Sequence, residues 1–492
     1  MLRDDEEVTG AAGGRRERAL TLGVVCSALF LALLDSTVVG LALPTVRRDL
    51  GADLTGLQWV VAGYVCPYAA LLLTGGFLGD RYGRRRVFLA GMAVFTAGSL
   101  LCAAAGSVAA LAAGRAVQGV GAAAVTPQTL ALLSQVFPGE RERAKALSTW
   151  SAVSGLALLL GPVAGGSSAE LLGWRSVFLL NVPVGVFALA VGRWLPGPVT
   201  AGPGRPLDGR GQLLIAAGLG AATYGLVEGP RAGWSAPPVA AALALSAAAA
   251  LTLLRAERRT THPALRLDFF RGRVFTGATS VTFLMAIALN AAYLVLSLRL
   301  QVLDGASPGR AGVRLLPTMA AIVVGAVVAG RLARRPVPWR PVAAGTALAG
   351  AALLSVAALA SGHPYAVWWP GAALMGLGMG LVMSPNNAAM LGGVRPEDTA
   401  QAAAMGGVAQ QVGALLGVAS LGAVLAPAAL TGQSSLTTAA RAELTAGLRH
   451  GLLLAGLCCL LATTATLLLT RGGRRAPRPD PVPDPTDVAD HA

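Results

Sequence analysis

GGFLGDRYGRRR at residues 75–86 joins the end of a long apolar segment to a cluster of arginines. Asp80 places a carboxylate at this boundary. There it can pair with an arginine or cap a neighbouring helix N-terminus in one conformation and be released in another. A simple basic turn is the alternative, but the spacing and composition together favour a conformational gate. The predicted gating loop consists of Gly79, Asp80, Arg81, Gly83, Arg84 and Arg85.

The arginines of this loop belong to a pattern that runs through the whole chain. Twenty-nine of the 39 Lys and Arg residues lie in or beside every second gap between long apolar stretches, nine lie in the other gaps, and Arg115 lies inside a stretch. Cytoplasmic loops of membrane proteins carry an excess of Lys and Arg. The alternation therefore predicts a protein of the cytoplasmic membrane with fourteen crossings and both termini in the cytoplasm.

The composition supports a membrane protein. Of the 492 residues, 54% are hydrophobic and 13% are charged, and such a composition is too apolar to cover a water-exposed surface. Apolar stretches of about 18 residues or more span lipid as helices. If the pair at 211–254 formed a re-entrant hairpin, the chain would cross twelve times with the same orientation. The predicted crossings are 20–43, 57–79, 86–105, 107–135, 146–170, 175–195, 211–229, 237–254, 274–297, 311–330, 341–360, 364–391, 400–427 and 448–470.

Several other classes of protein are disfavoured. The net charge of +15 does not indicate nucleic-acid binding, because the arginines sit in short clusters beside apolar segments, where topology and anionic lipids explain them. The five Cys and four His residues lack the spacing of metal ligands. Nucleotide-binding and hydrolase motifs are absent. We therefore expect no metal, no cofactor and no enzyme; a membrane-bound enzyme or receptor ranks far below a transporter.

An internal repeat predicts two similar halves. GGFLGDRYGRR at 75–85 aligns without gaps to GAVVAGRLARR at 325–335, and both segments end a crossing at the cytoplasmic face. Parallel repeats of a six-helix unit follow from this alignment. The expected fold is an all-α polytopic membrane protein with two six-helix bundles and two extra helices between them. The predicted regions are a cytoplasmic tail (1–19), an N-terminal bundle (20–195), a linker with the extra helices and a basic loop (196–273), a C-terminal bundle (274–470) and a disordered cytoplasmic tail (471–492).

The loop at 75–86 and five further motifs resemble one transporter family. The motifs occur in the expected order along the chain. Together they make the chain resemble the fourteen-helix drug:proton antiporter branch of the major facilitator superfamily. The resemblance implies a bacterial transporter that works by alternating access, as a monomer, driven by the proton gradient. Gly40 stands where an Asn is common, and the second-half loop lacks the Asp. The further motifs are LLDSTVVGLALPTVRRDLG (33–51), GRAVQGVGAA (114–123), SGLALLLGPVAGG (154–166), GWRSVFLLNVPVG (173–185) and QVLDGASPGRAGVRLLP (301–317).

Asp35 and Arg115 are the candidates for proton coupling. Asp35 lies about eight residues, or roughly 12 Å, from the predicted outer end of the first crossing, and Arg115 lies at a similar depth on the fourth. A carboxylate at that depth costs several kcal/mol unless it is protonated, paired or exposed to water, so a functional role is the default. A permanent structural ion pair is the alternative. The resemblance implies a role for Arg115 in proton coupling.

Two further groups of residues are candidates for the transport machinery. Glycines and a proline in the fifth crossing weaken that helix and allow another helix to pack closely, so we expect a kink there. Amides and an acid in other segments are tentative candidates to line the substrate cavity, although amides in lipid equally often bridge helices. The first group is Gly155, Gly161, Pro162, Gly165 and Gly166. The second is Gln118, Asn290, Asn386, Gln410 and Glu228.

These observations predict a secondary transporter that exports amphipathic drugs or antibiotics in exchange for protons. The alternative is a dedicated exporter of one metabolite, such as a self-made antibiotic or an amino acid, because a polyspecific cavity has no fixed polar code. The expected partners are the small-molecule substrate, protons and the lipid bilayer.

Overall fold

The computed structural model describes residues 2–137, 139–195, 208–257, 266–332, 339–360, 363–395, 398–424 and 438–470. Throughout these ranges the regular elements are all helices, so the predicted all-α fold is confirmed. Fourteen helical segments are long and apolar enough to cross a membrane, in agreement with the predicted number.

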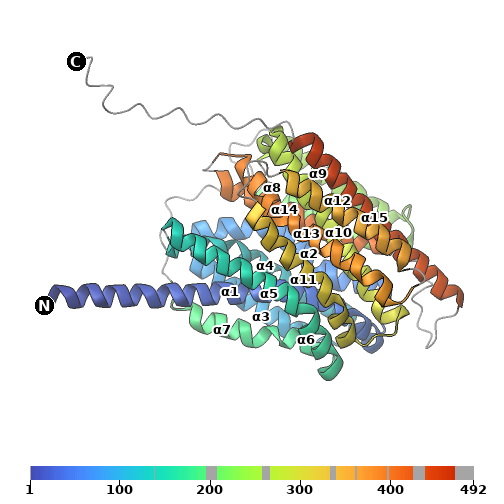
Figure 1. Cartoon of the computed structure of the whole chain (residues 1–492), viewed down its shortest axis with the longest axis horizontal. Coiled ribbons are helices and arrows are strands. Elements are labelled where there is room, and N and C mark those ends of the chain that lie inside the picture. Colours follow the sequence, from blue (N-terminus) through green and yellow to red (C-terminus); the bar gives the residue numbers. More distant parts are fainter. Residues whose placement is uncertain are drawn as a thin grey trace, which may run out of the picture.

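The helices follow the order expected of two bundles separated by an inserted pair (Figure 1). The first bundle comprises α1 (Leu2–Leu50), α2 (Leu54–Tyr82), α3 (Arg84–Ala103), α4 (Val108–Val136), α5 (Glu140–Leu172), and α6 (Arg175–Leu179) with α7 (Asn181–Gly192) as one broken crossing. The inserted pair is α8 (Gly209–Ala232) and α9 (Pro237–Glu257), followed by the short η1 (Leu267–Arg271). The second bundle comprises α10 (Arg273–Leu298) with η2 (Arg299–Leu303), α11 (Pro308–Leu332), α12 (Trp339–Leu359), α13 (Tyr365–Gly392), α14 (Thr399–Val424), and α15 (Thr438–Ala465) with η5 (Thr466–Thr470).

The two bundles repeat the same helix pairings. In the first, α1 packs on α5, and both α2 and α3 pack on α4. In the second, α10 packs on α14, and both α11 and α12 pack on α13. Equivalent glycines make close approaches in both bundles: a Cβ added to Gly75 of α2 would lie 2.0 Å from the carbonyl of Ala123, and one added to Gly325 of α11 would lie 2.4 Å from that of Leu377. Residues that the sequence repeat aligns, 250 positions apart, therefore occupy equivalent packing positions in the two bundles.

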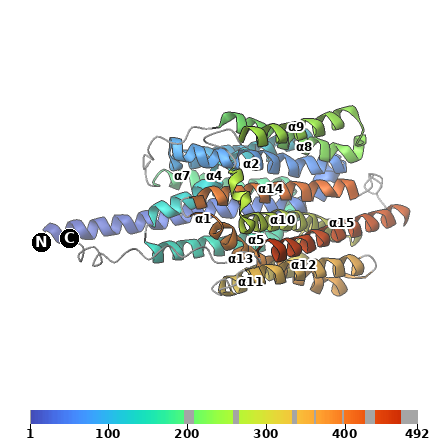
Figure 2. The ribbon, with the colours of Figure 1, turned by 90° about the horizontal axis from the view of Figure 1, so that it is seen from above.

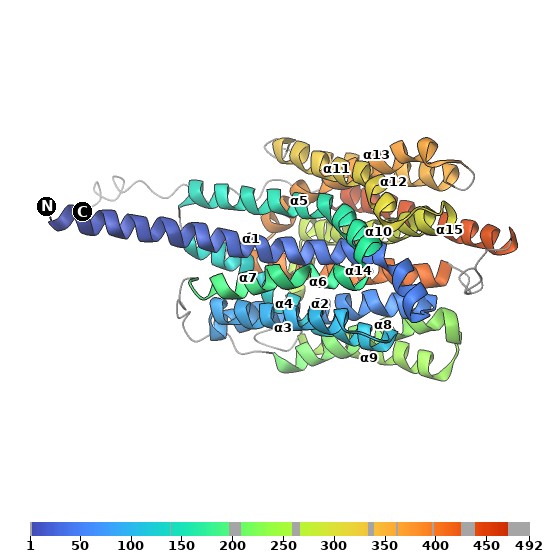
Figure 3. The same cartoon turned by 90° about the horizontal axis from the view of Figure 1, so that it is seen from below.

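The inserted pair lies at one edge of the molecule. Seen from above and from below, α8 and α9 occupy the edge opposite α11 and α12, and α1 projects beyond the other helices at its N-terminal end (Figures 2 and 3). α8 packs on α2 of the first bundle and on α14 of the second. The extra helices thus cover one of the two seams at which the bundles meet; α5 and α11 form the other.

The bundles are joined toward one face of the molecule. We call the end where α2 passes to α3 at Gly83 the basic face, and the end where α1 stops at Leu50 the opposite face. Where both partners are described residues, the hydrogen bonds between the bundles all lie in the halves of the helices nearer the opposite face. These bonds join Tyr293 to Thr37, Ser297 to Gly40, Gly309 to Glu170, and Gln58 to Val418 and Ala419.

The first crossing is longer than predicted. The expected end at residue 43 was wrong, because α1 continues through Pro44 to Leu50 and buries Leu43 and Val46 in the core. Asp35 is therefore fifteen residues from the end of its helix, about 22 Å rather than 12 Å. The last crossing also begins earlier than predicted, at Thr438.

The connection before α10 packs against the second bundle. Phe269 of η1 is buried, and its ring lies 5.3 Å from that of Phe275 in an edge-to-face contact. Arg266 donates hydrogen bonds to Asp268 and Asp398 and so ties this connection to the start of α14.

Candidate functional site

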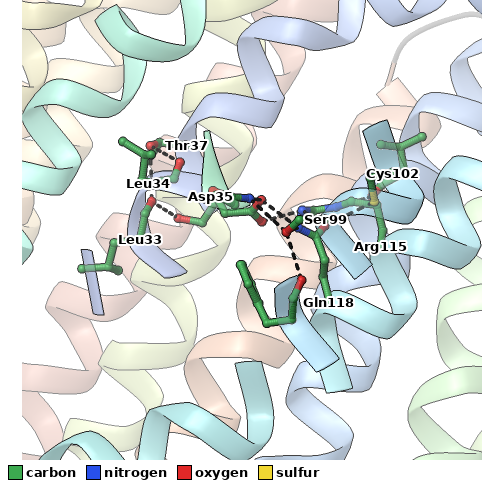
Figure 4. A network of polar contacts seen from close by, with 12 residues as sticks. Leu33, Leu34, Asp35, Thr37, Ser99, Cys102, Arg115 and Gln118 are labelled. Atoms are coloured by element: carbon green, nitrogen blue, oxygen red, sulfur yellow. Dashed lines mark hydrogen bonds and ion pairs between the residues drawn. The ribbon is translucent and has the colours of Figure 1, made fainter. Parts of the chain in front are cut away.

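Asp35 and Arg115 form an ion pair in the interior of the first bundle. Each residue is 1% exposed, and Nη1 of Arg115 lies 2.5 Å from Oδ2 of Asp35 (Figure 4). Asp35 comes from α1 and Arg115 from α4. The sequence left open whether these two residues pair, and in the structure they do.

The second oxygen of Asp35 is held by uncharged amides. Oδ1 accepts a hydrogen bond of 2.9 Å from Nδ2 of Asn181 and a longer one of 3.4 Å from Nε2 of Gln118. The same Gln118 nitrogen donates to the hydroxyl of Ser99 at 2.7 Å. Both carboxylate oxygens thus have donors, as a buried charge requires. Sequence reasoning missed Asn181 and Ser99.

The break in the sixth crossing explains how Asn181 reaches this site. A proline has no backbone N–H to donate, so Pro183 removes the helical hydrogen bond to the carbonyl of Leu179. The crossing is accordingly split at Leu180, and Asn181 is the first residue of α7. The amide is 1% exposed, and its Oδ1 has no hydrogen-bond partner. An amide two residues before a proline in an apolar crossing was the signal that could have identified it.

Arg115 has neutral partners in addition to Asp35. Its Nε donates to the carbonyl of Val60 at 3.2 Å, and its Nη1 donates to Oε1 of Gln118 at 2.9 Å. The guanidinium carbon lies 4.3 Å from the centre of the Tyr64 ring, a cation–π contact. These contacts stabilise the guanidinium independently of the charge on Asp35.

Close helix packing brings α4 to the neighbours that complete the site. A Cβ added to Gly119 would lie 2.3 Å from the carbonyl of Tyr64 on α2, and one added to Gly121 would lie 2.5 Å from the backbone nitrogen of Phe95 on α3. Only glycine permits such approaches without displacing a backbone. The motif GRAVQGVGAA thus positions Arg115 and Gln118 by allowing α4 to lie against both helices.

The burial of this pair has an energetic consequence. Removing two charges from water costs several kcal/mol each, and their attraction offsets this cost only with good geometry and additional hydrogen bonds. Loss of one partner leaves an uncompensated charge in the interior. A proton bound to Asp35 removes one of the two charges, so it changes the electrostatics of the whole bundle.

The ion pair and its amides belong to a single bundle. Asp35, Ser99, Arg115, Gln118 and Asn181 come from α1, α3, α4 and α7. A rigid rotation of one bundle against the other therefore leaves all their mutual distances unchanged. Any change in the contact between Asp35 and Arg115 requires α1 to move relative to α4.

The predicted gating loop lies at the basic face. Asp80 is exposed and accepts a hydrogen bond of 3.3 Å from Nη2 of Arg84, while Nη1 of Arg84 donates to the carbonyl of Ala131 on α4. Arg85 donates to the carbonyl of Leu195 at the end of the sixth crossing. Gly83 has a φ of +95°, a conformation that favours glycine. In this structure, the described contacts of Asp80 and Arg84 thus lie within the first bundle.

The glycines of α5 make close contacts on two sides. Added Cβ atoms at Gly161 and Gly165 would lie 2.0 Å from Oγ1 of Thr37 and 2.3 Å from Val38 of α1. At Gly166, the added Cβ would lie 2.3 Å from the carbonyl of Pro308 on α11, in the second bundle. The contact of Gly155 with α11 is looser, and Pro162 lies inside an α5 that runs unbroken from Glu140 to Leu172. The close packing expected of these glycines is observed against α1 at Gly161 and Gly165, and across the seam between the bundles at Gly166.

The tentative cavity residues lie in different environments. Gln118 belongs to the Asp35 network, and Asn386 bridges α13 to α10 by donating to the carbonyl of Ala278 and the hydroxyl of Thr282. Glu228 accepts a hydrogen bond of 2.8 Å from the Trp59 indole and so anchors α8 to α2. Asn290 is half-buried and Gln410 is exposed.

The first bundle also has an apolar groove. It has a volume of about 440 Å³ between α1, α5 and α7, and its lining includes Phe30, Val153, Pro183 and Phe187. Pro183 is two residues from Asn181, so the groove lies close along the chain to the Asp35 network. Within the described parts of the chain, no group of three His, Cys, Asp or Glu side chains is arranged to hold a metal ion.

Comparison with known proteins identifies the family. The family model described as the Major Facilitator Superfamily matches residues 25–418. The chain belongs to the major facilitator superfamily. Among curated relatives, it is 36% identical to a methylenomycin A resistance protein of Streptomyces coelicolor over 84% of this chain and 87% of that protein. It is also 37% identical to the puromycin resistance protein of Streptomyces alboniger, covering 82% and 81% of the two chains.

A third relative, the multidrug resistance protein Stp of Mycobacterium tuberculosis, is 32% identical over 84% of this chain and 76% of its own length. Among solved structures, an auto-inhibited peptide transporter of the POT family superposes with a TM-score of 0.66 at 19% identity, covering 94% of this chain and 99% of that one. At that identity, the likeness shows the shared major-facilitator fold alone. The resemblance read from the sequence motifs is confirmed at the level of the superfamily.

Proposed function

We propose that this protein is a proton-coupled exporter of amphipathic drugs or antibiotics that works by alternating access. The observation that carries the proposal is the buried pair of Asp35 and Arg115. An acid with a movable counter-charge in the membrane interior is what proton coupling requires. The relatives named for resistance to methylenomycin A and to puromycin support an exported, antibiotic-like substrate.

The orientation of the chain follows from its charges. The positive-inside rule assigns the basic face to the cytoplasm, which also places both ends of the chain there. The bundles are joined near the opposite face, so this arrangement corresponds to the state closed to the outside. In that state Arg115 contacts Asp35 and favours the carboxylate, which directs the proton to the cytoplasm.

The transport cycle then has a defined order. Substrate enters from the cytoplasm after Asp35 has lost its proton, and the bundles rock to open the outer face. There the contact with Arg115 weakens, Asp35 binds a proton from outside, and protonation promotes release of the substrate. While Asp35 is protonated, Val60, Gln118 and Tyr64 retain the guanidinium. The proton gradient is the source of energy, and no cofactor takes part.

The substrate cavity is proposed between the bundles. Asn290 and Gln410 remain the candidates to line it, because Gln118 and Asn386 are engaged in contacts between helices and Glu228 anchors α8. We propose that the loop of Gly79, Asp80, Arg81, Gly83, Arg84 and Arg85 acts as the gate at the cytoplasmic face. We also propose that Gly155, Gly161, Pro162, Gly165 and Gly166 let α5 flex as that gate operates, and that a monomer suffices.

Transport into inverted membrane vesicles with an imposed pH gradient tests the proposal. We expect uptake of a compound such as puromycin by the wild type and none above background by Asp35→Asn. Glu443→Gln, which neutralises an exposed acid at the start of α15, is the matched control and should transport normally. Gradient-driven uptake that survives Asp35→Asn would contradict the assignment.

A dedicated exporter of one compound is the second candidate. Relatives named as a tetracenomycin C resistance and export protein and as a probable actinorhodin transporter favour it. The two candidate functions differ in how many kinds of compound the protein exports. A resistance profile of cells that express this chain, measured against methylenomycin A, puromycin, tetracenomycin C and unrelated cationic dyes, separates them: protection against one compound indicates the dedicated exporter.

A further inference from the structure

A tyrosine of the second bundle contacts α1 close to Asp35. The hydroxyl of Tyr293 on α10 donates a hydrogen bond of 2.6 Å to the carbonyl of Thr37, two residues beyond Asp35. One helical turn further along α10, the hydroxyl of Ser297 donates to the carbonyl of Gly40 at 3.1 Å. The helix that carries the proton-binding acid is thus held directly by the opposite bundle.

Gly40 makes room for the tyrosine ring. A Cβ added to Gly40 would lie 2.8 Å from Cε1 of Tyr293, a distance that real Cβ atoms essentially never show. Any side chain at this position would displace the ring and with it the hydroxyl.

The contact of Tyr293 with α1 provides a route by which rocking of the two bundles can reach the ion pair of Asp35 and Arg115. α1 contacts α10 and α11 of the second bundle directly, whereas α4 packs mainly on α2 and α3 of its own bundle. A movement of the second bundle therefore reaches Asp35 directly through α1, and it reaches Arg115 only through other helices of the first bundle. Of the hydrogen bonds between the bundles, the one made by Tyr293 lies nearest to Asp35 along the chain.

The other groups around Asp35 come from its own bundle. Its charged or titratable neighbours are Arg115 from α4, Tyr64 from α2 and Cys102 from α3. α7 contributes the uncharged Asn181, and α5 presents Gly161 to this part of α1. Tyr293 is the group that α10 brings to the segment, and it acts on the backbone of α1.

We propose that Tyr293 is a positioning residue that couples the rocking of the bundles to the ion pair. With the outer face closed, its ring against Gly40 and its bond to Thr37 hold α1 so that Asp35 meets Arg115. When the outer face opens, α10 withdraws, α1 shifts against α4, and Asp35 becomes free to bind a proton. This inference rests on the proposed function for the role of the proton.

The sign of the pH response follows from linkage. The proton binds more tightly in the outward-open state, where Arg115 no longer opposes it, so acidification must shift the population toward that state. Removal of the Tyr293 hydroxyl removes a hydrogen bond that exists only in the closed state. The ratio of open to closed molecules should then rise about fivefold, the effect of one hydrogen bond of ordinary strength. The pH of half-opening should rise by up to about 0.7 unit.

Double electron–electron resonance across the outer face measures these quantities. Spin labels at Gly106→Cys, between α3 and α4, and His363→Cys, before α13, are both exposed at this face and report the separation of the bundles in lipid nanodiscs. We compare Tyr293→Phe with Tyr365→Phe as a function of pH. Tyr365 is the matched control, since its hydroxyl donates a bond of 2.7 Å to the carbonyl of Arg314 within the second bundle.

The expected result is that Tyr293→Phe opens the outer face at a higher pH and that Tyr365→Phe behaves like the wild type. Identical distance distributions and pH responses for the two variants would overturn the proposal. Failure of the proposed function would look different: the wild-type distance would ignore both pH and Asp35→Asn, while Tyr293→Phe would still differ from Tyr365→Phe.

Discussion

The two bundles share one packing scheme but differ in the chemistry of their interiors. In the first, α1, α3, α4 and α7 enclose an ion pair held by amides and a hydroxyl. In the second, the buried polar residues that the structure describes within the crossings are uncharged. Asn386 bonds to α10, and Thr463 of α15 donates to Thr346 of α12 at 2.9 Å. The comparison teaches that the repeat supplies the frame for both halves, whereas the buried ion pair found among the described residues lies in the first half.

This division suggests separate roles for the halves. A charge in the second interior would have to be paired or protonated, as in the first, and would add a second site that responds to pH. Without one, the second bundle can contact a neutral or cationic substrate without its own protonation changing. Tyr293 then transmits the position of this bundle to the half that holds the proton.

The largest expected effect comes from breaking the ion pair in the first bundle. Arg115→Gln leaves the charge of Asp35 buried without its partner, so unfolding should become easier by about 3–5 kcal/mol. The double variant Asp35→Asn/Arg115→Gln should recover much of this loss, because neither charge remains. Chemical unfolding in detergent measures the changes, with the exposed Arg310→Gln as control. An Arg115→Gln protein as stable as the wild type would show that the pair is not a buried charge pair.

Equivalent glycines test the shared frame. Gly75→Ala and Gly325→Ala each place a methyl group against a backbone carbonyl of the helix opposite, so each should cost about 1–3 kcal/mol of stability. Gly330→Ala is the control, because an added Cβ there meets nothing within 4 Å. Thermal unfolding of the three variants measures the difference. If only one of the two buried glycines is sensitive, the packing of the two halves is not equivalent.

Two buried asparagines sharpen the chemical difference. Asn181→Leu removes a donor to the Asp35 carboxylate and should slow proton-driven transport roughly tenfold, since hydrogen bonds to charged groups contribute about 1.5–3 kcal/mol. Asn386→Leu loses a bridge between helices and should reduce stability by about 1 kcal/mol. The pH dependence of transport by Asn386→Leu should match that of the wild type. An altered pH dependence in Asn386→Leu would place part of the proton pathway in the second bundle.

The smallest expected effect concerns charges at the end of the second bundle. Arg266 donates a hydrogen bond to Asp268 and holds the pKa of that carboxyl below its usual range. This contribution to stability is present above the ordinary Asp pKa and is lost as the pH falls through the lowered value. Arg266→Gln should therefore be slightly less stable than the wild type at neutral pH, and this difference should vanish in strong acid. Thermal unfolding at the two pH values provides the check.

Much of the fold could be predicted from the sequence, because alternating Arg clusters and long apolar stretches determine topology through simple transfer energetics. Similar depths on two helices made a pairing of Asp35 with Arg115 plausible without establishing it. The end of α1 was misplaced, because tertiary packing carries the helix beyond residue 43 to Leu50. Such packing cannot be read from a local pattern.

The rest of the site depends on contacts between distant helices. Asn181 reaches Asp35 because Pro183 breaks its crossing, and Tyr293 reaches α1 because position 40 is a glycine. Each contact depends on how two helices are rotated relative to each other. The pattern of residues along one helix does not specify that rotation. Glu228 illustrates the converse: an acid in an apolar segment suggested a cavity, yet it accepts a hydrogen bond from Trp59.

Proton release on substrate binding measures whether Asp35 carries the exchanged proton. Purified protein in weakly buffered detergent is mixed with a compound that it transports, and a pH indicator follows the release. The wild type and Glu443→Gln should release protons on binding, and Asp35→Asn should release none. Equal release by Asp35→Asn and the wild type would place the exchanged proton on another residue.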